Sequence, residues 1–188
     1  MPRWSGQLNG GNGGDVLIIP GWGDSGPEHW QTWLQFRNSA CKRVVQKEWI
    51  HVDRADWIST LDAYISECAR PTVLVAHSLS CILVAHWASL ARGRVAGALL
   101  VAPTDIERKE TAPPETWCFA PIPRQKLPFA SIVVASSNDP YTDLSTAQSL
   151  AVGWGSEFIN IGDAGHINVA SGHGPWLQGE HLVSQLLR

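Results

Sequence analysis

The sequence has few charged residues and no long hydrophobic run, and these two absences exclude several classes of protein. Charged residues make up 16% of the 188 residues, against roughly 25% in an average soluble protein. With 44% hydrophobic residues and a formal net charge of −3, the chain lacks the composition of a disordered protein. It also lacks the clustered basic excess of a nucleic-acid-binding protein, so nucleic acid is not an expected partner. No segment approaches the roughly 18 uninterrupted apolar residues of a membrane span, so no membrane association is expected.

Cysteine is sparse as well, and its spacing excludes a disulfide framework. The chain contains four cysteines and no CxxC pair, which is typical of reduced thiols in a cytoplasmic protein. The first residues lack the apolar h-region of a secretory signal, in agreement with that location. There is no HExxH motif, and the histidines lack the spacing of a zinc site, so neither a metal nor a cofactor is expected.

Strand-like and helix-like segments alternate along the chain. Residues 1–15, rich in Gly and Asn, are expected to form a flexible lead-in, and residues 16–188 a single domain. The apolar patterns predict strands at 16–19, 43–49, 72–76, 97–102, 131–136 and 157–161, and helices at 30–40, 56–70, 79–91, 144–152 and 175–187. This alternation predicts an α/β fold with a mainly parallel central sheet of about six strands flanked by helices.

The segment 103–128 fits neither assignment. It contains six of the twelve prolines and is long for a connection. It is therefore either an ordered surface excursion or a flap over a site.

One serine lies between a buried strand and a helix. Ser78 stands in TVLVAHSLSC, an arrangement typical of the G-x-S-x-G nucleophile elbow, where the helix N-terminus stabilises developing negative charge. The elbow needs small residues two positions before and after the serine, and here these are Ala76 and Ser80. The steric requirement is met although neither is glycine. The alternative role for such a serine is that of a helix N-cap.

A serine nucleophile needs a histidine base and an acid that holds the base in place. In this architecture the chain order is Ser, Asp or Glu, then His, with the last two on loops after late strands. Asp139 follows the fifth expected strand and His166 follows the sixth. The order therefore predicts a triad of Ser78, Asp139 and His166, with Asp105 as an alternative acid and His173 as an alternative base.

The loop after the first expected strand has two interpretations. Gly21, Gly23 and Gly26 match G-x-G-x-x-G between a strand and a helix, as in a Rossmann-like dinucleotide-binding protein. Against this, Trp22 stands where a backbone would have to approach a pyrophosphate closely. In a hydrolase the backbone N–H groups of Leu79 and Trp22 would instead form the oxyanion hole.

Tryptophan is abundant, with 10 residues beside 2 tyrosines and 4 phenylalanines. We expect Trp30 and Trp117, with Gly21, Gly23 and His29, to line the substrate site, which favours a small or medium acyl or aromatic substrate. The alternative for a tryptophan such as Trp30 is packing against the sheet, since large aromatic side chains usually serve the core.

Four segments resemble those of a known family. PGWGDSGPEHWQTW, VLVAHSLS, ASSNDPY and GDAGHINVASGHGPW are similar to the small serine hydrolases of the RBBP9/YdeN type, in the α/β-hydrolase superfamily. The resemblance runs from about residue 16 to the C-terminus and departs at Ser80, where members usually have glycine. It implies a single-domain α/β-hydrolase fold without a separate cap domain, with Ser78 as nucleophile, Asp139 as acid and His166 as base.

The expected function is that of a serine hydrolase which transfers an acyl group in two steps from a small-molecule substrate, a small carboxylic ester or alternatively a thioester or amide. No metal takes part in this mechanism. A binding module that keeps the scaffold with weak catalysis is the alternative, because a fold alone does not establish activity.

Overall fold

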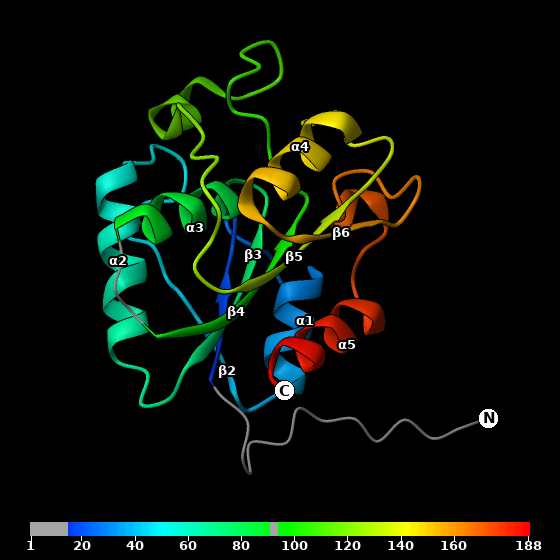
Figure 1. The fold of residues 1–188 in the computed structure, drawn as a ribbon. Helices are drawn as coiled ribbons and strands as arrows, with labels where there is room; N and C mark the ends of the chain where they lie inside the picture. Colours follow the sequence, from blue (N-terminus) through cyan, green and yellow to red (C-terminus); the bar gives the residue numbers. More distant parts are fainter. Residues whose placement is uncertain (1–14, 91–93) are drawn as a thin grey trace, which may run out of the picture.

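Six parallel strands form one sheet, in the order β2-β1-β3-β4-β5-β6 (Figure 1). The structure is a computed structural model that describes residues 15–90 and 94–188. The strands are β1 (Val16–Ile19), β2 (Cys41–Arg43), β3 (Thr72–His77), β4 (Val95–Val101), β5 (Ala130–Ala135) and β6 (Glu157–Asn160). Every residue of β1 and β3 is buried, as expected for continuous apolar runs in a parallel sheet covered on both faces. The predicted α/β fold is confirmed, whereas the lead-in expected at 1–15 lies outside the described residues except for residue 15.

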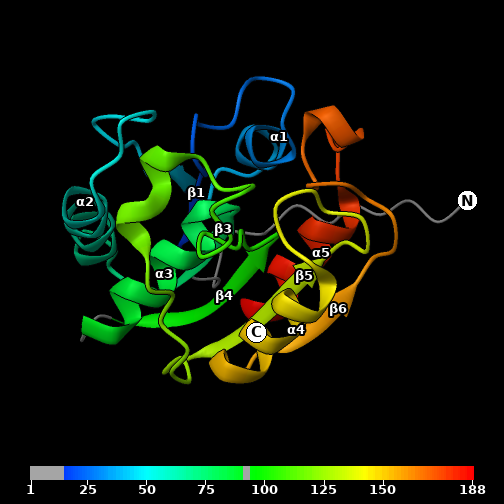
Figure 2. The same cartoon turned by 90° about the horizontal axis from the view of Figure 1, so that it is seen from above.

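Helices cover both faces of this sheet (Figures 1 and 2). One face packs against α2 (Arg54–Ser66), α3 (Leu79–Leu90) and α4 (Leu144–Trp154). The other packs against α1 (Trp30–Arg37) and α5 (Leu177–Leu186). Because successive side chains of a strand point to opposite faces, Leu17 and Ile19 belong to the first core, and Val16 and Ile18 to the second. Among the described residues, no helix is both long and apolar enough to cross a bilayer.

The second strand is the element that the sequence predicts wrongly. The expected strand at 43–49 is absent, and β2 spans Cys41–Arg43 instead. The backbone that follows forms turns: the Glu48 carboxylate accepts hydrogen bonds from the two N–H groups at positions 50 and 51. The carbonyl of Trp49 accepts the N–H of Gly23, which lies in the loop between β1 and α1, here called the glycine loop. The N–H of Val44 still donates to the carbonyl of Ile18 in β1 (2.9 Å), but these later backbone groups are paired outside the sheet.

The other predicted elements are present, β1 with the expected bounds and the rest with one or both ends shifted. Helix α2 begins two residues before the expected 56–70, because the Asp53 carboxylate accepts the N–H of Asp56 and so caps the helix. It ends at Ser66, four residues before the expected end at residue 70. The terminal helix, expected from residue 175, begins at Leu177.

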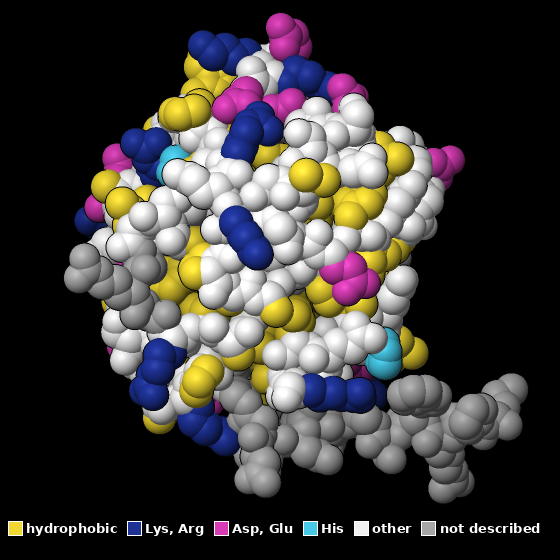
Figure 3. All heavy atoms as spheres, in the orientation of Figure 1, with side chains coloured by type: hydrophobic (Ala, Val, Ile, Leu, Met, Phe, Trp, Pro, Cys, Tyr) yellow, Lys and Arg dark blue, Asp and Glu magenta, His cyan; other side chains and the backbone are white. Residues whose placement is uncertain are grey.

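The proline-rich segment 103–128 is an excursion that packs onto the domain. It contains a short 3₁₀ helix, η1 (Pro114–Phe119), and buries Phe119, Ile122 and Leu127 in the core beside α3. The described residues form no separate cap domain. Acidic and basic side chains are interspersed at the end of the molecule that the excursion forms (Figure 3), where ion pairs join Arg108 to Asp143 (2.8 Å) and Arg124 to Glu107 (2.6 Å).

Candidate active site

Ser78 lies at the sharp turn between β3 and α3. Its backbone has a φ of +58°, in the left-handed region that non-glycine residues rarely adopt and that often marks a functional site. Its N–H donates to the carbonyl of Val101 at the end of β4 (2.9 Å), and its carbonyl accepts the N–H of Cys81 (3.0 Å) as α3 begins. The hydroxyl is therefore fixed at the carboxyl end of the sheet.

The glycine loop packs directly against this turn. A Cβ on Gly21 would lie 2.9 Å from the carbonyl oxygen of His77 and 2.9 Å from the Cβ of Ser78, so no larger residue fits without displacing the turn. Ser80, the departure from the family pattern, is fully buried, and its hydroxyl donates to the carbonyl of Pro20. The serine at position 80 thus adds a hydrogen bond between α3 and the glycine loop.

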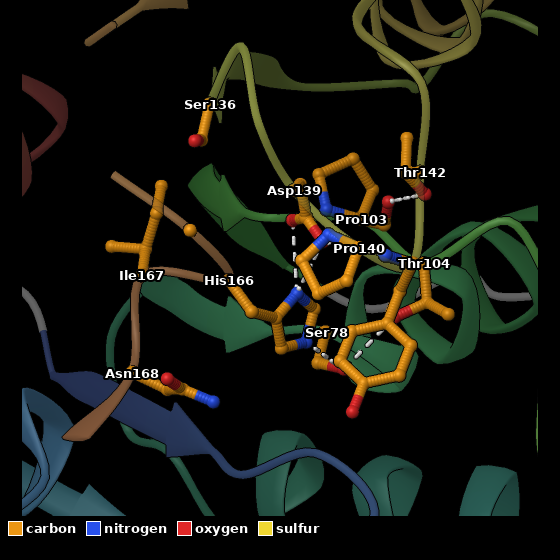
Figure 4. Close-up of polar contacts among 12 residues, drawn as sticks. Ser78, Pro103, Thr104, Ser136, Asp139, Pro140, Thr142, His166, Ile167 and Asn168 are labelled. Carbon is orange, nitrogen blue, oxygen red and sulfur yellow. Dashed lines mark hydrogen bonds and ion pairs between the residues drawn. The ribbon is translucent and has the colours of Figure 1, made fainter. Parts of the chain in front are cut away.

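The side chains of Ser78, Asp139 and His166 form a continuous chain of hydrogen bonds (Figure 4). Ser78 Oγ lies 2.8 Å from His166 Nε2. His166 Nδ1 lies 3.0 Å and 2.9 Å from the two carboxylate oxygens of Asp139. An imidazole that donates its Nδ1 proton to a carboxylate leaves Nε2 free to accept a proton from a hydroxyl. Only 3% of the Asp139 side chain and 8% of the His166 side chain are exposed, which shields this contact from water.

Hydrogen bonds tie the loop after β5 to the loop after β6. The Asn138 side-chain oxygen accepts the N–H of Gly165 (2.7 Å), and the Ser136 hydroxyl accepts the N–H of Ala164 (2.9 Å). These contacts fix the distance between the carboxylate of Asp139 and the imidazole of His166. Sequence reasoning gave Asn138 and Ser136 no role, because such residues are common in any turn.

Two buried side chains fix the backbone of the imidazole loop. His77 Nε2 donates to the carbonyl of His166 (2.9 Å), and Trp30 Nε1 donates to the carbonyl of Ile167 (2.9 Å). Ile167 has a φ of +48°, a strained conformation for a β-branched residue that these contacts help to hold. Burial lowers the pKa of His77 well below its usual value of 6.5, so its ring is neutral.

Comparison with known proteins identifies the family. A family model described as serine hydrolase matches residues 16–185 of this chain. The chain belongs to this serine hydrolase family.

Solved structures agree with this assignment. A YdeN-like hydrolase from Pectobacterium atrosepticum is 32% identical, with 92% of this chain and 91% of that chain covered and a TM-score of 0.81. The ydeN gene product of B. subtilis is 21% identical over 92% and 98% of the two chains, with a TM-score of 0.76. The fold is also that of a Paleococcus ferrophilus monoacylglycerol lipase, 11% identical over 92% and 93%, with a TM-score of 0.67. No curated protein matches the chain.

This small serine hydrolase has a cavity of about 170 Å³ beside Ser78. Five segments far apart in the sequence contribute to its wall. It is lined by Gly21, Trp22, Asp24, His29, His77, Ser78, Leu79, Thr104, Pro113, Thr116, Tyr141, His166 and Asn168. Residues of the excursion 103–128 therefore form part of the wall. The segment is an ordered surface excursion, and it also borders the site.

Three residues expected in the substrate site lie elsewhere in this serine hydrolase. Trp30 is 1% exposed and packs in the core, as in the alternative considered above. Trp117 donates its indole N–H to the carbonyl of Ala112, and its ring lies under the ammonium of Lys109, 4.7 Å from the ring centre. Gly23 donates its N–H to the carbonyl of Trp49 in the loop after β2 (3.0 Å) and is not among the residues that line the cavity. Of the expected set, Gly21 and His29 line the cavity.

The two backbone N–H groups expected at the oxyanion hole belong to residues of the cavity wall, Leu79 and Trp22. Within the described part of the chain, neither N–H donates a hydrogen bond to a protein group. The indole of Trp22 is 37% exposed and donates to the carbonyl of Ile50 (2.8 Å), so the side chain lies at the rim. Of the three glycines in the pattern, Gly21 packs closely against Ser78. Family membership favours the hydrolase interpretation of this loop over the dinucleotide one.

His29 joins the cavity wall to α1. Its Nδ1 accepts the N–H of Gln31 (3.2 Å) and so caps the helix. Burial, with repulsion from Arg43 and His166, lowers the pKa of His29 to about 4. The ring is therefore neutral at physiological pH and carries its proton on Nε2.

The alternative acid and base lie outside the hydrogen-bonded chain. The Asp105 carboxylate accepts the N–H of Glu107 (3.1 Å), and His173 Nδ1 contacts the hydroxyl of Ser171 (3.4 Å). Residues 15–90 and 94–188 contain no group of three His, Cys, Asp or Glu side chains placed to hold a metal ion.

Sequence reasoning also missed several residues of the cavity wall, among them Thr104, Thr116, Tyr141 and Asn168. Tyr141 packs its ring against that of His166, with 4.6 Å between ring centres, and Thr104, Thr116 and Asn168 contribute polar atoms to the wall. Tyr141 and Asn168 lie in segments that carry the family resemblance, and Thr104 and Thr116 lie outside them. In none of the four does the sequence show that the side chain reaches the cavity, because this depends on the paths of three separate loops.

Proposed function

We propose that this serine hydrolase cleaves small carboxylic esters by two-step acyl transfer, with Ser78 as nucleophile, His166 as base and Asp139 as the acid that orients the base. The observation that carries the proposal is the pair of contacts on the imidazole, 2.8 Å to Ser78 Oγ and 2.9 Å to the nearer oxygen of Asp139. Serine, imidazole and carboxylate in this geometry are the groups that acyl transfer requires.

The reaction begins when Ser78 Oγ attacks the ester carbonyl and its proton passes to His166 Nε2. The carbonyl oxygen becomes negatively charged, and the N–H groups of Leu79 and Trp22 donate to it. His166 then gives its proton to the departing alcohol, which leaves the acyl group on Ser78. A water molecule, deprotonated by His166, attacks this acyl group, and Ser78 Oγ recovers its proton as the acid is released. Asp139 stabilises the imidazolium that forms in both steps.

The size of the cavity supports a small substrate. At about 170 Å³ it is smaller than the roughly 300–1,000 Å³ of common ligand pockets. A short acyl group fits such a space, while a long chain would have to extend over the rim formed by Trp22 and Tyr141, both 37% exposed. A cytoplasmic location, in keeping with the four free cysteines of the described chain, is part of this proposal.

A fluorophosphonate probe tests the proposal. The wild type and the control Ser145→Ala, which removes an exposed serine on α4, are expected to be labelled, and Ser78→Ala is expected to remain unlabelled while folded. With p-nitrophenyl esters, Ser78→Ala should lower kcat on the order of 10⁵-fold, and the wild-type kcat/KM should fall as the acyl chain lengthens. A folded wild type that neither reacts with the probe nor hydrolyses any ester would contradict the proposal and favour a binding module.

A further inference from the structure

Thr104, the third residue after β4, contacts the reacting oxygen itself. Its hydroxyl oxygen lies 2.9 Å from Ser78 Oγ, and the two side chains are joined by a dashed line in Figure 4. Thr104 is 6% exposed and belongs to the wall of the cavity. The proposed two-step mechanism does not use this hydroxyl.

The direction of the hydrogen bond follows from the protons available. Since Asp139 accepts the Nδ1 proton of the imidazole, His166 Nε2 is an acceptor and takes the single proton of Ser78 Oγ. Thr104 must then be the donor to Ser78. In the part of the chain that the structure describes, no other acceptor lies within hydrogen-bond distance of the Thr104 hydroxyl.

The backbone on both sides of Thr104 is held by one buried side chain. The Thr142 hydroxyl donates to the carbonyl of Pro103 (2.6 Å) and accepts the N–H of Asp105 (2.6 Å). Before them, Ala102 has a φ of +50° and donates its N–H to the carbonyl of Val134 (2.8 Å). Thr142 follows Asp139 in the loop after β5, so the loop that carries the acid also holds the backbone around Thr104. A donor fixed in this way needs no rearrangement when charge develops.

We propose that Thr104 is a further catalytic residue whose hydroxyl stabilises negative charge on Ser78 Oγ, an inference that rests on the proposed function. In the first step Ser78 Oγ loses its proton to His166 and forms the bond to the acyl carbon with one lone pair, while the other accepts from Thr104. In the second step the bond between the acyl carbon and Oγ breaks, its electron pair moves to Oγ, and His166 returns the proton. Hydrogen bonds to charged oxygens are stronger than those to neutral ones, so the donation is worth most in the transition states.

Two variants separate the hydroxyl from the shape of the side chain. Thr104→Val keeps the shape and removes the donor, and Thr104→Ser keeps the donor. The second-order rate of fluorophosphonate labelling and kcat/KM for p-nitrophenyl acetate are measured with both, and with Thr146→Val on α4 as the control. Thr104→Val is expected to lower both rates by about tenfold or more, as for one hydrogen bond to a charged group, and Thr104→Ser to restore most of the loss. A merely structural role would instead make the rates follow the thermal stability of the variants.

The outcomes distinguish this inference from the function on which it rests. If the folded wild type is not labelled, the proposed function fails. If the wild type is labelled and Thr104→Val reacts at the same rate, the role of Thr104 is refuted while the function stands. Should Thr104→Val not fold, Thr104→Ala takes its place, and equal rates for Thr104→Ala and Thr104→Ser would refute the role.

Discussion

Protonation of His29 is expected to destabilise the fold in mild acid. The ring is 5% exposed and caps α1 by accepting the N–H of Gln31 at Nδ1. Burial, helped by repulsion from Arg43, lowers its pKa from 6.5 to about 4. As the pH falls below 6.5, the unfolded chain therefore binds a proton that the folded chain does not, and the equilibrium shifts toward unfolding. The stabilisation is complete above pH 6.5 and is lost as the pH falls toward 4.

The magnitude follows from the two pKa values. A fall from 6.5 to about 4 corresponds to about 3 kcal/mol in total. About 2 kcal/mol of this is lost between pH 7 and pH 5, because the unfolded histidine is almost fully protonated at pH 5 and the folded one is still neutral. For a domain whose free energy of unfolding is typically about 5–15 kcal/mol, this is a large fraction.

Urea unfolding followed by tryptophan fluorescence at pH 7 and pH 5 measures the effect. His29→Asn removes the titrating group and keeps a side chain that caps helices well, so its loss of stability between the two pH values should be smaller than that of the wild type by about 2 kcal/mol. Contributions from other groups, including His77, are shared by both proteins and largely cancel. The exposed His51 provides the control, and His51→Asn should behave as the wild type. If His29→Asn loses as much stability as the wild type, the reasoning about burial is refuted.

Two further predictions concern the site. His166→Ala should lower kcat for ester hydrolysis on the order of 10⁵-fold, whereas His173→Ala should retain activity because its ring contacts Ser171; steady-state kinetics with both variants decide, and the reverse result would assign the base to His173. Gly21→Ala would place a Cβ 2.9 Å from the Cβ of Ser78, so it should cost about 1–3 kcal/mol in the free energy of unfolding and slow labelling by the fluorophosphonate. Urea unfolding and labelling at wild-type values would show that the turn has room for a methyl group.

Much of the fold could be predicted from the sequence because parallel strands buried on both faces are continuous apolar runs. This pattern located β1 and β3, and with them the turn at Ser78. It failed for β2, where Val44 is buried and Val45 exposed. The strand itself is Cys-Lys-Arg, with two charged residues, whereas the apolar pair Val44 and Val45 lies just beyond it, so the apolar pattern placed the strand too late in the chain.

The residues of the candidate site could be predicted where the order of the elements along the chain constrains their position. They could not be predicted where the direction of a side chain decides whether it reaches the cavity. Asp139 and His166 follow late strands, and parallel strands bring those ends to one edge of the sheet. Trp30 and Trp117 could not be assigned, since a large aromatic side chain gains as much from the core as from a cavity. Thr104 had no signal at all, because its contact with Ser78 depends on how the backbone turns after β4.

The excursion between β4 and β5 has a consequence for how such proteins diversify. Ser78, Asp139 and His166 follow the ends of β3, β5 and β6, whereas Pro113 and Thr116, which also line the cavity, belong to the excursion. Exchanging the stretch from residue 105 to residue 128 for that of a relative would alter which compounds are admitted and leave the machinery that reacts with them in place. If the proposed function holds, selectivity and reactivity are thus encoded in separable parts of one small polypeptide.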